Sequence, residues 1–148
     1  MSSESRQQLL LVLLQEVTAA MRLQSEPEHL YTAASIAGFG AVAWGVASLD
    51  MTKHPSSIPL LVAAGGVLIT ALLVIVKLWH AHNHYSKFND ARIDVMRRLS
   101  NLNRDKNVFP PMMLEGKPGW GFAISISIVG VTGAAAVAFC LARIFFGA

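Results

Sequence analysis

Three histidines lie close together in the run His80-Ala-His82-Asn-His84. If this run is helical, His80 and His84 are one turn apart and share a face, and two imidazoles at this spacing can bind a transition metal. A third ligand is not assured by the run, although Asp90 or a neighbouring chain could supply one. Three interpretations therefore stay open: ligation of a metal or haem, pH-sensitive chemistry at an interface, and a solvated face at the membrane edge. We expect no metal and no cofactor, with His80 and His84 as weak candidates for ligands.

The residue types needed for nucleophilic catalysis are present, but they are not arranged for it. Ser35, Ser125, Ser127 and Thr132 lie in apolar stretches, and no Asp or His is placed to activate them. In such stretches a hydroxyl usually bonds a carbonyl one turn back or a neighbouring helix. No carboxylate is expected inside the membrane, which argues against a transporter or proton channel as well. We predict that the protein is not an enzyme.

The composition of the whole chain is that of a membrane protein. Of its 148 residues, 53% are hydrophobic and only 14% are charged, whereas a soluble domain carries about 25% charged residues. Mean hydropathy is +0.48. The net charge of +3 is too small to indicate a nucleic-acid partner. A single cysteine, Cys140, excludes an internal disulfide and a C-x-x-C pair.

Three stretches reach the roughly 20 apolar residues that a helix needs to cross a bilayer. Glu28 and His29 close the first stretch at one end, and Asp50 closes it at the other. The predicted fold is all-α, a polytopic membrane protein with an N-terminal amphipathic helix and an inner-side helix. Its predicted segments are an amphipathic arm (1–29), transmembrane helix 1 (30–49), a short outer loop (50–57), transmembrane helix 2 (58–79), an inner-side helix with a Pro/Gly linker (80–119) and transmembrane helix 3 (120–146).

Two apolar stripes at helical spacing flank the first two spans. The arm and the inner-side helix each carry five such residues among polar ones, and we expect the inner-side helix to continue the second span into the aqueous phase. The stripes are Leu10, Leu13, Leu14, Val17 and Met21 in the arm, and Phe88, Val95, Met96, Leu99 and Leu102 in the inner-side helix.

The orientation in the membrane follows from the basic residues. The arm has two Lys or Arg residues and the link between the second and third spans has seven, whereas the outer loop has only Lys53. Positively charged segments stay inside, so we expect the N terminus inside and the C terminus outside, in a bacterial or organellar inner membrane. A surface for lipid headgroups, or secondarily for a partner protein, is expected at Lys77, Arg97, Arg98, Arg104 and Lys106.

Small residues recur at every fourth position along two spans and as a pair in the other. In lipid, small residues let two helix backbones approach closely. The stripes therefore predict helix contacts, either within the chain or between chains. The residues are Ala33, Ala37, Ala41 and Gly45 in the first span, Gly65 and Gly66 in the second, and Gly130, Ala134, Ala138 and Ala142 in the third.

Two functions remain. The first is a non-catalytic accessory subunit that binds other membrane proteins, or copies of itself, within a larger assembly. The second comes from the order of elements over about residues 5 to 103, where an inner helix, a span, a short outer link, a span and a second inner helix follow one another. This layout resembles the SLATT domains, small bacterial membrane proteins proposed as pore-forming effectors, and the resemblance implies a self-oligomerising pore. The third span departs from that layout.

Overall fold

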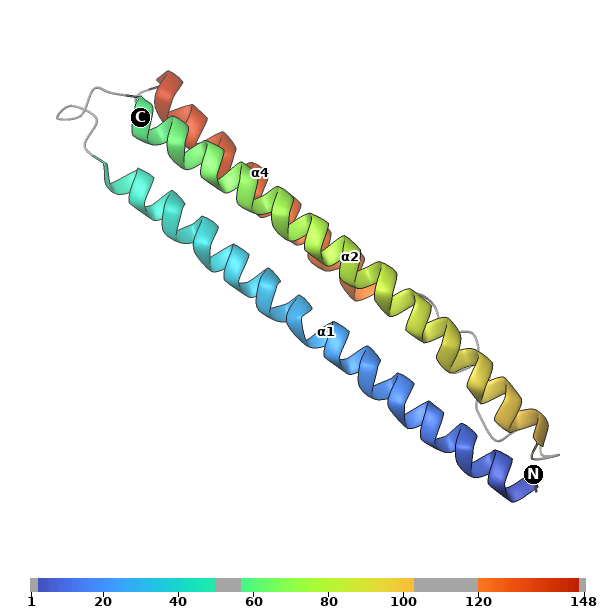
Figure 1. Ribbon diagram of the computed structural model, residues 1–148. Helices are drawn as coiled ribbons and strands as arrows, with labels where there is room; N and C mark the ends of the chain where they lie inside the picture. The colour runs from blue at the N-terminus through green and yellow to red at the C-terminus, as the bar shows by residue number, and fades with distance from the viewer. Residues whose placement is uncertain (1–2, 50–56, 103–119, 147–148) are drawn as a thin grey trace. The chain divides into compact units, whose positions relative to one another are not determined.

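The computed structural model describes residues 3–49, 57–102 and 120–146, and each of these residues except Leu49 and Ser57 lies in a helix. The helices are α1 (Ser3–Ser48), α2 (Ile58–Leu102) and α4 (Trp120–Phe146), as Figure 1 shows. No strand occurs among the described residues. All three helices are long and apolar enough to cross a membrane. The predicted all-α class with three membrane-length helices is therefore confirmed.

The two long helices join segments that the sequence analysis treated separately. Helix α2 runs without a break from Ile58 to Leu102, so the second span does continue into the following helix. Helix α1 also continues, from Ser3 to Ser48, through Pro27. The expected division between an arm and a first span is therefore not a break in the helix. Pro27 lacks an N–H, so one backbone hydrogen bond is missing there, but helical conformation persists on both sides.

The chain forms two compact units, and α1 and α2 contribute one part to each. Unit 1 contains residues 1–27 and 80–120, and unit 2 contains residues 28–79 and 121–148. The helical parts of unit 1 are therefore the first half of α1 and the second half of α2. Unit 2 contains the second half of α1, the first half of α2, and α4 from Gly121 onward.

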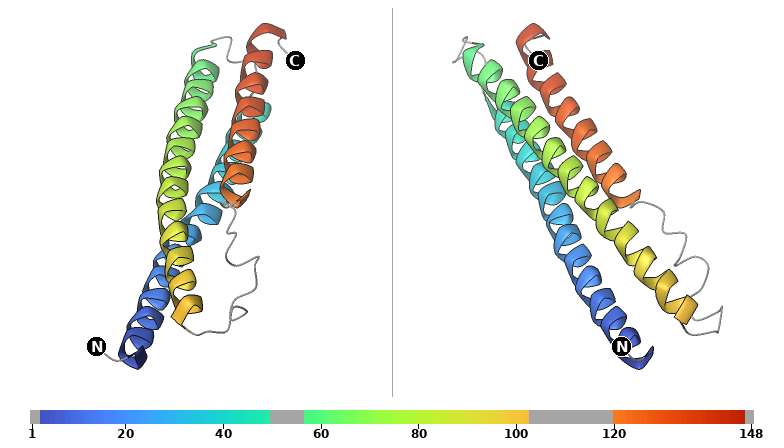
Figure 2. Two further views of the ribbon diagram at one scale, coloured as in Figure 1. Left: turned by 90° about the vertical axis from the view of Figure 1, so that its right-hand side faces the viewer. Right: turned by 45° about the vertical axis from the view of Figure 1, so that its right-hand side comes forward.

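Unit 2 is a bundle of three helices (Figure 2). Its core residues recur in alternating steps of mainly three and four, the average spacing of 3.5 that keeps one helix face against its neighbours. One cluster lies around Phe39 and Val129, and a second lies around Leu60 and the fully buried Cys140. The buried hydrophobic residues are Phe39 and Val46 of α1, Leu60, Ala64, Val67, Ala71 and Leu78 of α2, and Phe122, Val129, Ala136 and Cys140 of α4.

A glycine allows the closest approach between helices in this core. A Cβ atom added to Gly133 of α4 would lie 3.0 Å from the Cβ of Ala71 and 3.4 Å from Cε2 of Phe39. Contacts this short are tighter than ordinary packing allows. Gly133 thus sets how closely α4 can approach α1 and α2, and it was not among the small residues that the sequence analysis selected.

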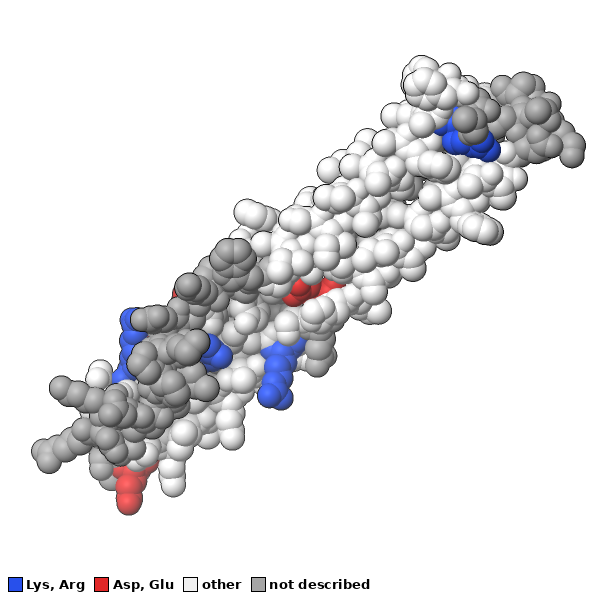
Figure 3. Space-filling model, turned by 180° about the vertical axis from the view of Figure 1, so that it is seen from behind, with Lys and Arg blue, Asp and Glu red and all other residues white. Residues whose placement is uncertain are grey.

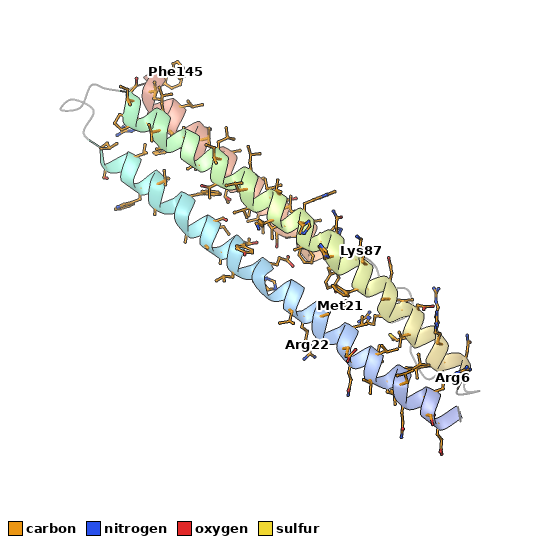
Figure 4. All side chains as sticks on the ribbon, in the orientation of Figure 1. Arg6, Met21, Arg22, Lys87 and Phe145 are labelled. Carbon is orange, nitrogen blue, oxygen red and sulfur yellow. The ribbon has the colours of Figure 1, made fainter. Side chains whose placement is uncertain are left out.

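Unit 1 packs the first part of α1 against the last part of α2 through larger side chains. Leu10, Met21, Met96 and Leu99 are buried. Figure 4 shows Met21 on the side of α1 that faces α2 and Arg22 on the opposite side. Of the remaining residues in the two predicted stripes, four are half-buried, namely Leu14, Val17, Phe88 and Val95, whereas Leu13 and Leu102 are exposed.

Candidate functional site

A buried carboxylate is the main polar feature of the core of unit 2. The side chain of Glu28 is only 5% exposed. Its Oε1 accepts a hydrogen bond from the hydroxyl of Ser125, at 2.6 Å. Such a short bond to a carboxylate is typical of a charge-assisted interaction. It joins the first residue of α1 in unit 2 to the second turn of α4, across 97 positions of sequence.

The carboxylate of Glu28 lies over the first turn of α4. A Cβ on Gly121 would be 3.4 Å from Oε1 and 3.8 Å from Oε2, so a glycine at this position leaves room for both oxygens. The first turn of a helix has N–H groups without intrahelical partners and carries a partial positive charge. A negatively charged side chain is favoured there. Glu28 therefore supplies α4 with a counter-charge from a neighbouring helix.

An arginine makes the corresponding contact at the other end of the same two helices. Nη2 of Arg143, in the last turn of α4, donates to the carbonyl oxygens of Ala47 at 3.4 Å and Leu49 at 3.1 Å. The last carbonyls of a helix carry a partial negative charge and lack intrahelical partners. Arg143 thus caps α1 in the way that Glu28 complements α4.

We call Glu28, Ser125 and Arg143 the α1–α4 brace. Because the starts of the two helical segments meet at Glu28 and their ends meet at Arg143, α1 and α4 run parallel within unit 2. The helix between Glu28 and Ala47 rises about 28 Å at about 1.5 Å per residue, close to the roughly 30 Å thickness of a bilayer core. The charges of the brace therefore stand near the two edges of an apolar layer of membrane thickness.

This site corrects one part of the sequence analysis. Glu28 was expected to close the first span at one end, and no carboxylate was expected inside the membrane. The structure buries Glu28 instead. The signal was its register: Glu28, Thr32, Ser35 and Phe39 follow steps of four, three and four, and all four side chains are buried. Glu28 was placed at the end of the span because of its charge, without regard to this register.

The other hydroxyls behave as expected for apolar helices. Ser35 donates to the carbonyl of Tyr31 at 2.7 Å, Ser127 to that of Ala123 at 2.8 Å, and Thr132 to that of Ile128 at 2.7 Å. Each bond spans one helical turn. Only Ser125 uses its hydroxyl on a side chain of another helix, within the hydroxyl bonds described for these four residues.

The predicted small-residue stripes lie outside the core of unit 2. A Cβ on Gly45, Gly65, Gly66 or Gly130 would meet no atom within 4 Å. In a helix of 3.6 residues per turn, residues four positions apart differ by about 40° around the helix axis. A stripe with a constant step of four therefore drifts away from the core-facing side of the helix, whereas alternating steps of three and four stay on that side. Gly65 and Gly130 are half-buried, and the exposed members are Ala33, Ala37, Ala41, Gly45, Gly66, Ala134, Ala138 and Ala142.

His80 and His84 come together on α2 in unit 1. Their Nε2 atoms are 3.1 Å apart, and the rings meet edge to face with centroids 4.5 Å apart. His82, between them in sequence, is half-buried. No group of three or more His, Cys, Asp or Glu side chains in the described part of the chain could hold a metal ion.

The expected basic surface is described in part. Lys77, Arg97 and Arg98 are exposed, and Arg104 and Lys106 lie outside the described residues. Arg98 pairs with Asp94 one turn earlier, at 2.9 Å. In unit 1, Arg6 and Arg98 also border a groove of about 580 Å³ whose apolar lining includes Leu9, Leu10, Leu13 and Leu102.

No protein-family model, curated protein or solved structure matches this chain.

Proposed function

We propose that this protein is a non-catalytic integral membrane subunit. In this role it associates with other membrane-protein subunits, or with copies of itself, through the small-residue faces of its spans. The observation that carries the proposal is the exposure of Ala33, Ala37, Ala41 and Gly45 on α1 and of Ala134, Ala138 and Ala142 on α4. Contact between a helix and lipid chains does not require small residues, whereas close association of two helices within lipid depends on them.

The limited burial of the spans supports the same conclusion. In the most apolar window of each helix, only 17% of α1, 22% of α2 and 28% of α4 is buried within the chain. On the face drawn in Figure 3, most of the surface that belongs to described residues is uncharged. Lipids and partner helices are the surroundings that such a surface fits, and nucleic acid is not.

Two shallow grooves in unit 2 would admit side chains of a partner helix. One groove, of about 270 Å³, lies between α1 and α2 and is lined by Gly38 and Gly66 among others. The other, of about 320 Å³, lies between α1 and α4 and is lined by Gly40 and Ala43 among others. Grooves bordered by small residues favour insertion of the ridge of a neighbouring helix.

The proposal includes an orientation. With nine Lys and Arg in the arm and the inner link against one in the outer loop, the N terminus lies inside and the C terminus outside. The inner or matrix side then carries Arg97 and Arg98, which face anionic headgroups or a partner.

One substitution on each of the two stripes tests the proposed association. Ala41→Leu and Ala134→Leu are expected to reduce the mass of the particle extracted in mild detergent, because a bulky side chain separates the helices that meet there. Ala47→Leu is the matched control, since Ala47 is also exposed but lies about 120° around α1 from Ala41. Native mass spectrometry gives the particle mass for each variant.

Loss of mass in the two stripe variants with retention in Ala47→Leu supports the proposal. An unchanged particle mass in all three variants, or a single chain in the wild type, contradicts it.

Reconstitution of the purified chain alone into liposomes separates this role from a pore, because an accessory subunit leaves the vesicles impermeable to ions and small dyes. Ion flux from the isolated chain would favour the pore instead.

A further inference from the structure

We propose that His80 and His84 form a binding site for a divalent transition-metal ion such as Cu²⁺, Ni²⁺ or Zn²⁺. The inference is independent of the proposed function. Both residues lie on α2 in unit 1, one helical turn apart, and their Nε2 atoms are 3.1 Å apart. This convergence of two ring nitrogens is the observation that the sequence spacing by itself could not supply.

The separation of the two nitrogens fits a shared metal. Metal-to-imidazole bonds are about 2.0–2.1 Å long. Two such bonds at a right angle, as in square-planar or octahedral sites, place the nitrogens about 2.9 Å apart, and a tetrahedral angle places them about 3.4 Å apart. The observed 3.1 Å lies between these two values. The separation of the two nitrogens therefore matches that of two imidazoles bound to one ion, and binding requires the ring nitrogens to turn from each other toward that ion.

The surroundings determine which ions are suitable. Nitrogen ligands select late transition metals, whereas Mg²⁺ and Ca²⁺ require oxygen ligands. His80 is exposed and His84 is half-buried, so water can complete the coordination sphere. Lys87, three residues after His84, is also exposed, and its positive charge opposes a bound cation. We therefore expect binding in the order Cu²⁺ over Ni²⁺ and Zn²⁺, with an affinity suited to reversible occupancy.

The alternative for this pair is a hydrogen bond without a metal, in which one neutral imidazole donates to the other. Both arrangements bring the two Nε2 atoms close together. Only the metal site predicts a change in bound-metal stoichiometry and in the ligands of the metal when either ring is removed. The experiment therefore measures how much Cu²⁺ the protein binds and how many imidazole nitrogens coordinate it.

The full-length protein, purified in mild detergent with an affinity tag free of histidine, is titrated with Cu²⁺ and followed by electron paramagnetic resonance. The wild type should show one high-affinity Cu²⁺ per pair, with hyperfine coupling from two imidazole nitrogens. His80→Ala and His84→Ala should each weaken binding at least tenfold and remove one nitrogen coupling. Circular dichroism of each variant verifies that the helices are retained, and His84→Gln provides a second variant at the same position.

His29→Ala is the matched control, because His29 is an exposed histidine on α1 without a partner at this spacing in sequence. It should bind Cu²⁺ as the wild type does. Equal affinity and equal nitrogen coupling in the wild type and in His80→Ala would overturn the proposal. The same loss of binding in His29→Ala as in His80→Ala would overturn it as well, because the ion would then not be held specifically by the pair.

Discussion

The two units of this protein differ in the sizes of the side chains that they bury. Both use helix faces that follow alternating steps of three and four. Unit 1 buries Leu10, Met21, Met96 and Leu99, whereas the core of unit 2 combines large side chains such as Phe39, Leu60 and Leu78 with small ones, namely Ala64, Ala71, Gly133, Ala136 and Cys140.

The physical difference is the solvent expected around each unit. Outside its core, unit 1 carries charged residues such as Asp94, Arg97 and Arg98, and unit 2 carries exposed apolar residues such as Trp44 and Val131. In water, burial of a large apolar side chain stabilises a fold by about 1.5–3 kcal/mol. In lipid this gain is absent, and close contact through small residues replaces it. The core composition of each unit therefore agrees with the surface around it.

The two units also differ in how charge is used. The pair Arg98 and Asp94 in unit 1 is exposed and one turn apart, and such pairs contribute about 0–1 kcal/mol. In unit 2 the α1–α4 brace directs its charges at helix ends, and Glu28 is buried. A buried charge needs its partners, so loss of a single hydrogen-bond donor from the brace should destabilise unit 2.

The largest expected effect is in unit 1. Met96→Ala removes a buried side chain and leaves a cavity, so the free energy of unfolding of unit 1 should fall by about 2–5 kcal/mol. Hydrogen exchange in detergent should show faster exchange for amides of residues 80–102 and little change for residues 58–79. Leu102→Ala, at an exposed position, is the control. Equal acceleration in both ranges would mean that the two units do not unfold separately.

The next largest effect is expected at Gly133, in the core of unit 2. Gly133→Leu should lower the free energy of unfolding by about 1–3 kcal/mol or more, because the added side chain meets Ala71 and Phe39. Gly130→Leu, three residues earlier, adds the same side chain at a position where a Cβ atom would meet no other atom within 4 Å. Thermal unfolding of the isolated chain compares them. Equal melting temperatures for these two variants would contradict the assignment of Gly133 to the close approach.

The smallest of these effects concerns the brace. Ser125→Ala removes the donor to the buried Glu28, and a buried charged group without its donor costs about 1–3 kcal/mol. Ser127→Ala removes only a bond to the carbonyl of Ala123 on an exposed side, so it should cost almost nothing. Chemical unfolding in detergent measures both. The interpretation fails if the two serine variants have the same stability.

The sequence by itself determined the helical class of the protein and the number of apolar stretches long enough to cross a membrane. These properties are sums over about 20 residues, so they depend little on any single contact: α4 spans Trp120–Phe146, the stretch predicted for the third span, and α2 begins at Ile58 as predicted. The one-turn hydroxyl bonds of Ser127 and Thr132 were also predictable, because they require only the helix that contains them.

Only the tertiary structure decided which face of each helix is buried, because a face is selected by its neighbours and not by composition. Small residues occur on several faces of α1 and α4, and Gly133, rather than the stripe through Gly130, lies against Ala71. The burial of Glu28 likewise required Ser125 and the start of α4. The 3.1 Å approach of His80 and His84 required particular side-chain rotamers, which spacing alone does not select.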